Sequence, residues 1–114
     1  MMDIQVEARD GLALVTLTGD AMGGPAGTAL HDRLRQEREA GRRNVVVDLS
    51  GIDRMNSSGL GMLIGALTIA RNAGGDLLLA SPGDRVLQLL TVTRMLGVFE
   101  THDSVDAAVA SFAG

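Results

Sequence analysis

Cysteine is absent from the 114 residues, and aromatic side chains are almost absent. The missing thiols exclude disulfide frameworks, thiolate metal sites and cysteine nucleophiles. The aromatic residues are Phe99 and Phe112, so the chain offers no stacking platform for single-stranded nucleic acid and no aromatic-lined cofactor cleft. Binding must therefore rest on aliphatic, methionine and small side chains.

Lysine is absent too, and all ten basic residues are arginines against fourteen carboxylates, which leaves a net charge of -4. Such a chain has no positive field that would gather phosphate backbones, so nucleic acid is a poor candidate for a partner. No basic stretch followed by an apolar region opens the sequence, and no apolar run approaches the ~18 to 20 residues of a membrane span. We therefore expect a cytoplasmic protein without a membrane partner.

The chain does have enough material for one folded domain. Hydrophobic residues make up 46% and charged residues 21%, which is ordinary globular usage. The length leaves little room for a second domain, so residues 1–114 are expected to form a single domain.

Hydrophobic periodicity predicts an alternation of strands and helices. Two alternating runs around Asp10-Gly11 indicate a β-hairpin, formed by residues 4–8 and 12–17. Further strands are expected at residues 44–49, 77–80 and 98–100, and helices are expected from Pro25 to near Gly41, over residues 60–70, after Gly83 and after a cap at Asp103 or Ser104. Strands separated by helices of this length imply parallel pairing with right-handed crossovers. The predicted fold is a small α/β sandwich, in which an antiparallel hairpin opens a mixed, mostly parallel sheet of about four to five strands with about four helices.

One segment is built differently from the rest. The strand at residues 44–49 leads through a loop, which includes Asp53 and Arg54, to a helix whose opening contains Asn56, Ser57, Ser58, Gly59 and Gly61. The polar residues are good helix caps, whereas each glycine would cost about 1 kcal/mol relative to alanine inside a helix. Glycines in a first turn leave the backbone open to another molecule, and the free N–H groups there favour an anion.

Four interpretations compete for this segment. In the first, the serines only cap the helix and the glycines only allow close helix packing. In the second, Gly59, Gly61 and Gly65 form a dinucleotide fingerprint, but they lie about ten residues past the strand and the chain is short for such a domain. In the third, a serine is a hydrolase nucleophile, but G-x-S-x-G is absent and the candidate bases, His31 and His102, are expected to be solvated. In the fourth, a serine is phosphorylated on a docking surface, where a dianion replaces an uncharged, open patch.

The segment resembles a family signature. Residues 48–61 read D-L-S-G-I-D-R-M-N-S-S-G-L-G, which is similar to the D-L-S-x-[VIL]-x-x-[MI]-D-S-S-G-[LI]-[GA] signature of STAS domains, specifically of stand-alone bacterial anti-sigma factor antagonists. Residues 17–20, L-T-G-D, resemble the family's L-x-G-[ED] motif, and residues 71–75 resemble its helix-ending glycine pair. The resemblance covers nearly the whole chain.

The resemblance implies a binding module that has no catalytic residue, cofactor or metal. In such proteins the unphosphorylated form binds an anti-sigma factor that is often also an ATP-dependent serine kinase, and this frees the sigma factor. Phosphorylation of the first serine of the pair ends binding, and a serine phosphatase restores it. By position, the phosphoacceptor is Ser57, and the partner-binding residues are Asn56, Ser57, Ser58, Gly59, Leu60, Gly61 and Met62.

Two features of this chain differ from the family pattern. Asn56 stands where the family has aspartate, so a charge that would help a kinase align the acceptor is missing. The passage from Asp20 to Ala26 lacks the family's G-E-L-D run and is slightly longer. We expect Asp20 itself to be a turn residue.

Methionines near the helix opening suggest a further contribution to docking. Met22, Met55 and Met62, if exposed, would form a soft apolar surface suited to a partner. Asp53 and Arg54 are expected to be ordinary solvated residues. The same fold would also serve as a non-phosphorylated STAS interaction module of a transporter or sensory complex, and this is the alternative function.

Overall fold

The chain begins with a β-hairpin. The structure is a computed structural model and describes residues 2–113. Strand β1 (Met2–Arg9) pairs antiparallel with strand β2 (Leu12–Ala21). The turn between them consists of Asp10 and Gly11, whose φ angles are 52° and 80°. Two successive residues with positive φ match the right-handed twist of the flanking strands, which explains the Asp-Gly pair at this turn.

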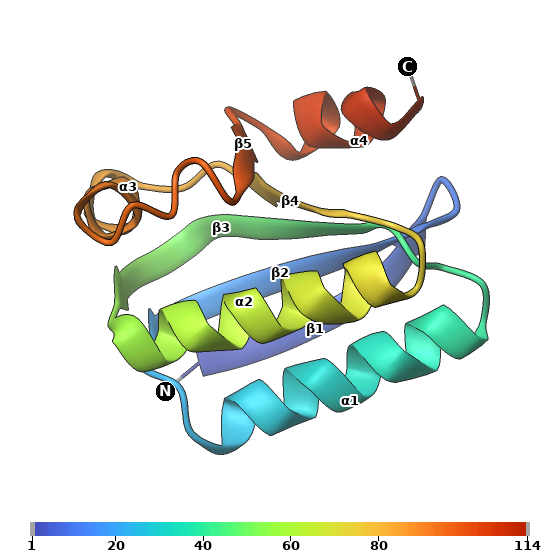
Figure 1. Ribbon diagram of the computed structural model, residues 1–114, viewed down its shortest axis with the longest axis horizontal. Coiled ribbons are helices and arrows are strands. Elements are labelled where there is room, and N and C mark those ends of the chain that lie inside the picture. Colours follow the sequence, from blue (N-terminus) through green and yellow to red (C-terminus); the bar gives the residue numbers. More distant parts are fainter. Residues whose placement is uncertain (1, 114) are drawn as a thin grey trace.

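Helices and strands alternate through the rest of the described chain. In order, these elements are α1 (Pro25–Glu39), β3 (Val45–Met55), α2 (Ser57–Asn72), β4 (Leu77–Ala80), α3 (Asp84–Val92), β5 (Glu100–His102) and α4 (Val105–Ala113). The sheet has the strand order β1-β2-β3-β4-β5, and every pair after the hairpin is parallel (Figure 1). This confirms the predicted α/β fold class. Among residues 2–113, no helix combines the length and the apolar character that crossing a membrane requires.

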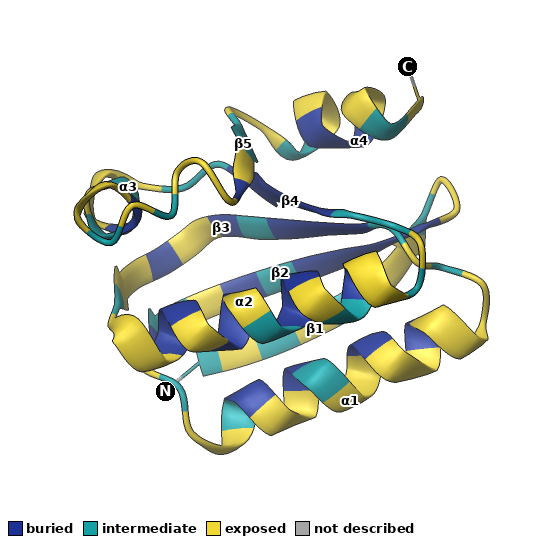
Figure 2. Cartoon of the chain, viewed as in Figure 1, coloured by how far each residue is buried: buried dark blue, intermediate teal, exposed yellow. Residues whose placement is uncertain are grey.

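Helices cover both faces of the sheet, with α1 and α2 on one side and α4 on the other (Figure 1). Side chains of β3 alternate between the two sides. Val45, Val47 and Leu49 belong to the larger core, which α1 and α2 share, whereas Val46 belongs to the smaller core under α4. β3 is therefore buried on both faces, as its unbroken apolar run predicts. Figure 2 shows the same arrangement on the helices, which are buried toward the sheet and exposed outward.

Strand β3 is longer than the periodicity predicts. It runs to Met55, so the expected loop over residues 50–54 is wrong. The strand continues because β2 continues beside it, and Asp20 and Ala21 pair with Arg54 and Met55. Two register irregularities interrupt this part of the ladder. The irregularities and the polar residues of the extension remove the alternation that a periodicity search detects.

Two further differences concern the C-terminal part of the chain. The last strand begins at Glu100 rather than at residue 98, and it includes His102. Phe99, at the centre of the predicted strand, is a buried core residue just before β5. Of the two predicted caps of α4, Ser104 is the one observed, because its Oγ accepts a hydrogen bond from the Ala107 N–H at 3.0 Å.

Candidate functional site

The candidate site lies where β3 passes directly into α2. Met55 ends the strand, Asn56 has an extended backbone with φ -106° and ψ -177°, and Ser57 begins the helix. Oδ1 of Asn56 accepts a hydrogen bond from the N–H of Gly59 at 2.9 Å. Asn56 is therefore the helix cap, and Ser57 and Ser58 are the first two helical residues.

The residues predicted to contact a partner divide into exposed and buried groups. Those with exposed surface are Asn56, Ser57, Ser58 and Gly61, and we call them the helix-opening surface. The buried ones are Gly59, Leu60 and Met62. These three residues lie on the side of α2 that faces the core, and the exposed fractions of Leu60 and Met62 are 5% and 4%. The surface available to another molecule is therefore smaller than the sequence predicts.

Glycine is present at positions 59 and 61 of the helix opening under different structural constraints. A Cβ on Gly59 would run into the carbonyl oxygen of Ala21, which also accepts a hydrogen bond from the Asn56 N–H at 3.2 Å. Close packing against β2 therefore requires Gly59, as the packing interpretation proposes. Gly61 is exposed, and a Cβ there would meet nothing within 4 Å. Neither packing nor helix propensity favours glycine at position 61.

The three methionines do not form a joint surface. Met22 is 42% exposed, Met55 is half-buried against the larger core, and Met62 is buried. α1 covers Met62, since a Cβ on Gly27 would lie 3.5 Å from the Met62 Cγ. Of the three, Met22 alone offers a large exposed apolar side chain.

Both histidines are half-buried and have specific partners, so they are less solvated than the sequence predicts. Nε2 of His31 lies 2.8 Å from the carbonyl oxygen of Met62. Nε2 of His102 lies 2.8 Å from Oε2 of Glu100, and the His102 side chain is 22% exposed. Neither contact involves a serine of the helix opening. The geometry therefore gives no support to the serine hydrolase interpretation.

Of the two predicted reasons against the dinucleotide interpretation, the short chain still holds, but the distance between the strand and the glycines does not. β3 ends at Met55, so the glycines follow the strand closely instead of lying about ten residues past it. Packing within the chain accounts for two of the three glycines. Gly59 faces β2, and a Cβ on Gly65 would lie 2.5 Å from Cε1 of His31 on α1. Both glycines are required by contacts within the chain rather than by a phosphate.

Charges near the helix opening come from the ends of β2 and β3. Nη2 of Arg54 lies 3.6 Å from Oδ2 of Asp20, and the arginine side chain is 63% exposed. Asp20 is thus a strand residue with an ion-pair partner, not a turn residue. An ion pair this exposed contributes little to stability. The first turn of α2 carries no acidic residue, so the helix-opening surface itself is uncharged in the unmodified protein.

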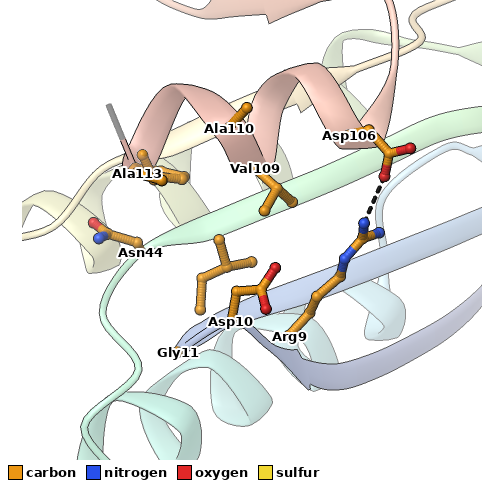
Figure 3. A pocket seen from close by; sticks show the side chains of 10 residues that line it. Arg9, Asp10, Gly11, Asn44, Asp106, Val109, Ala110 and Ala113 are labelled. Atoms are coloured by element: carbon orange, nitrogen blue, oxygen red, sulfur yellow. Dashed lines mark hydrogen bonds and ion pairs between the residues drawn. The ribbon is translucent and has the colours of Figure 1, made fainter.

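A hollow of about 570 Å³ lies at the opposite end of the sheet, between the hairpin turn and α4 (Figure 3). Nη2 of Arg9 and Oδ1 of Asp106 form an ion pair of 2.5 Å at this hollow. The hydrogen bond to Asp106 raises the pKa of the Arg9 guanidinium, which stays charged at every physiological pH. The lining contains no serine, histidine or cysteine, and residues 2–113 hold no group of three side chains suited to a metal ion.

The sheet order, the crossovers and the serine-glycine helix opening together define the class of protein. Residues 3–108 match the STAS domain family, and the chain belongs to this family. The match includes the hairpin, the central strand and the whole of α2. It confirms the resemblance that the signature at residues 48–61 indicates.

Named relatives and solved structures resemble the chain over nearly its full length. BtrV of Bordetella bronchiseptica, provisionally named an anti-sigma factor antagonist, is 27% identical over 111 residues, which cover 97% of this chain and 95% of BtrV. The anti-sigma factor antagonist SpoIIAA in its unphosphorylated form has a TM-score of 0.82 at 15% identity, covering 98% of this chain and 97% of SpoIIAA. The phosphorylated form of the Bacillus cell fate determinant SpoIIAA has a TM-score of 0.74 at 13% identity, covering 96% and 99%. At this level of identity the two solved structures show a shared fold.

Proposed function

We propose that this protein is an anti-sigma factor antagonist, which binds an anti-sigma factor with serine kinase activity, frees the sigma factor and is switched off by phosphorylation of Ser57. The observation that carries the proposal is the position of Ser57, an exposed hydroxyl on the first residue of α2 within an uncharged surface. The names of BtrV and SpoIIAA support the function class. The existence of a phosphorylated form of SpoIIAA supports phosphorylation as the switch.

The unmodified helix-opening surface suits a protein partner. Its residues are small and uncharged, and Gly61 lets a partner's backbone approach α2 closely. Because packing within the chain does not require glycine at position 61, close approach by a partner is the role that we assign to Gly61. Gly59, Leu60 and Met62 support the surface from the core side, and Met22 supplies exposed apolar area on the neighbouring segment.

Phosphorylation of Ser57 would change this surface without refolding the chain. A phosphate adds about -1.5 to -2 charges at pH 7. The helix dipole and the free N–H groups of the first turn favour an anion, so the chain itself tolerates the phosphate. A partner fitted to the uncharged surface would have to desolvate a dianion, and binding is lost.

Asn56 is compatible with this switch on electrostatic grounds. Its Oδ1 caps α2 through the Gly59 N–H, as an aspartate would, but it carries no charge. A phosphate on Ser57 therefore meets no like charge from the capping residue.

The proposal implies two protein partners and no chemistry by the chain itself. One partner is the anti-sigma factor with its kinase activity, and the other is a serine phosphatase that restores the free hydroxyl. The protein then works in the cytoplasm as a single domain over residues 1–114, without a cofactor, a metal or direct contact with nucleic acid or membrane.

Mass spectrometry tests the switch. The purified protein is incubated with ATP and, one at a time, with each purified anti-sigma factor kinase of the same organism. Intact mass and fragmentation then locate any added phosphate. We expect one phosphate, on Ser57. An unmodified protein that nevertheless binds such a kinase stably would contradict the switch and favour the alternative, a STAS interaction module that is not phosphorylated.

A further inference from the structure

Strand β1 forms one edge of the sheet, and its outer side pairs with no other strand among the described residues 2–113 (Figure 1). It is long for an edge strand. Its eight residues pair with β2 without a bulge, and none of them is a proline or a lysine. The strand at the opposite edge, β5, has three residues. A long and regular edge has unpaired N–H and C=O groups that can take up a further strand.

The hairpin determines which backbone groups of β1 point outward. Arg9 and Leu12 flank the two-residue turn, and such a turn makes its flanking residues a hydrogen-bonded pair. Hydrogen-bonded and non-hydrogen-bonded pairs alternate along an antiparallel ladder, so Ile4 and Val6 direct their N–H and C=O groups away from β2. A hydrogen bond supports this assignment, because Nη2 of Arg33 on α1 donates to the carbonyl oxygen of Val6 at 3.2 Å.

A groove of about 310 Å³ lies between β1 and α1. Its lining consists of Ile4, Val6, Ala29, Asp32, Arg33 and Gln36. The four lining residues of α1 are three, four and seven positions apart, so they lie on one face of the helix. Ile4 and Val6 are half-buried and leave apolar surface in the groove. A free strand edge beside a helix and a groove suits β-augmentation, in which main-chain hydrogen bonds give affinity and alternate side chains give specificity.

The other face of β1 is acidic. Asp3, Gln5 and Glu7 alternate with the apolar residues, and all three are exposed. Arg9 continues the same row, but it is paired with Asp106 of α4. Among the described residues, no ion pair includes Asp3 or Glu7. A strand added to β1 would place every second side chain beside this row, where basic side chains would pair with the carboxylates.

This charge pattern favours a basic partner over a second copy of the chain. A second β1 would bring two further carboxylates to the edge and no free cation. In the antiparallel register that aligns Ile4 with Val6 of the other copy, Asp3 of each copy would lie opposite Glu7 of the other. Like charges directly opposite each other destabilise a pair of strands. The net charge of -4 adds to the repulsion between copies.

We propose that the edge of β1 and the groove beside it bind an extended segment of a protein partner as an additional strand, in which apolar residues alternate with arginine or lysine. The apolar side chains enter the groove over Ile4 and Val6, and the basic side chains lie beside Asp3 and Glu7. In the free protein Arg33 occupies the carbonyl oxygen of Val6, and a main-chain N–H of the partner takes its place. The site shares no residue with the helix-opening surface, so the inference goes beyond the proposed function and does not depend on it.

Fluorescence anisotropy with a labelled peptide tests the proposal on the full chain. The probe has about eight residues, the length of β1, and alternates arginine with valine. Two further peptides carry N-methyl groups, one on its valines and the other on its arginines. An added strand uses the N–H groups of alternate residues, so one methylated peptide should bind like the parent and the other at least about tenfold more weakly. No binding of the parent peptide, or equal affinities of the two methylated peptides, would overturn the proposal.

Matched pairs of carboxylate substitutions test the acidic row. Asp3→Asn combined with Glu7→Gln removes both of its carboxylates. Glu39→Gln combined with Asp103→Asn removes the same charge at exposed positions outside the groove. We expect the first pair to weaken binding of the parent peptide about tenfold and the second to change it less than about twofold. Equal losses would show that net charge alone attracts the peptide and would contradict the proposed site.

Removing Arg33 should strengthen binding of the parent peptide. Arg33→Ala frees the carbonyl oxygen of Val6 and takes a positive charge out of the groove, for an expected gain of about threefold. Arg38→Ala is the matched control, because it removes the same charge from an exposed position of α1 that does not line the groove. If Arg33→Ala bound no more tightly than Arg38→Ala, the peptide would not be pairing with the edge at Val6.

Sedimentation velocity of the protein without peptide distinguishes a partner segment from a second copy. We expect a monomer at the concentrations used for the anisotropy measurements. A dimer that the parent peptide dissociates would overturn the choice of occupant and assign the edge to a second copy of the chain. None of these assays contains an anti-sigma factor or a kinase, so their failure would leave the proposed function untouched, and the failure of that function would leave this site untouched.

Discussion

Nε2 of His31 donates a hydrogen bond to the main-chain carbonyl oxygen of Met62 at 2.8 Å, and the same imidazole fills the space that a side chain on Gly65 would need. The contact joins α1 to α2 near the opening of α2. Both helices begin at the same end of the sheet (Figure 1).

Substitutions of His31 and Gly65 should therefore be strongly coupled. Gly65→Ala forces the imidazole to move and breaks its hydrogen bond to Met62, so we expect a loss of about 1–3 kcal/mol in the free energy of unfolding. After His31→Ala the same alanine has room, and its helix propensity makes it neutral or stabilising. Urea unfolding of the four proteins in this cycle measures the coupling. Additive effects would show that the ring and Gly65 do not compete for space.

Alanine substitutions at the two glycines of the helix opening should change stability in opposite directions. Gly61→Ala adds a methyl group in open space and is expected to raise the free energy of unfolding by about 0.5–1 kcal/mol. Gly59→Ala pushes a methyl group against the carbonyl oxygen of Ala21 and is expected to lower it by about 1–3 kcal/mol. Urea unfolding of both variants checks the signs. A destabilised Gly61→Ala would mean that position 61 is confined after all.

The stabilised variant also tests the docking surface. If a partner's backbone approaches α2 at Gly61, then Gly61→Ala should weaken binding of the anti-sigma factor about tenfold, although the protein itself is more stable. Gly97→Ala is the matched control, because a Cβ there also meets nothing within 4 Å and the position lies outside the helix-opening surface. Titration calorimetry with the purified anti-sigma factor measures both. Identical affinities for the two variants would place Gly61 outside the interface.

Features with a local cause could be predicted from the sequence. The hairpin follows from Asp10-Gly11 because those two residues supply the turn by themselves. The start of α1 follows from Pro25, and the cap of α2 follows from the polar residues before Gly59. The family signature adds the candidate site, since its residues are contiguous at the junction of β3 and α2.

Features with a distant cause could not be predicted. The extension of β3 depends on β2 continuing beside it, and Gly59 depends on the position of Ala21. The sequence predicts a solvated His31, because its contact with Met62 exists only when α1 packs against α2. Leu60 and Met62 belong to a signature that resembles a binding motif, but that motif also contains the residues that attach α2 to the core. A contiguous motif identifies a segment, not the side of it that faces a partner.

The effect of a negative charge at position 56 on stability should depend on whether Ser57 is phosphorylated. Asn56→Ala removes the cap and is expected to cost about 0.5–2 kcal/mol of stability. Asn56→Asp keeps the cap and adds a negative charge at the helix N-terminus, for an expected gain of about 0.3–1 kcal/mol. With phosphoserine at position 57 that gain should disappear or reverse, because two negative charges are then adjacent. Melting temperatures of the modified and unmodified proteins check this, and an aspartate that stabilises both equally would show that the phosphate is directed away from position 56.

The most direct test of the central claim is the affinity of the purified anti-sigma factor for wild-type protein, Ser57→Ala and Ser57→Asp, measured by titration calorimetry. The account predicts that Ser57→Ala binds like wild type, because the surface stays uncharged. Ser57→Asp should bind at least about tenfold more weakly, because a carboxylate must be desolvated in the interface. Circular dichroism should show the same fold and a similar melting temperature for all three proteins. Equal affinities for the alanine and aspartate variants would contradict the claim that charge at Ser57 controls binding.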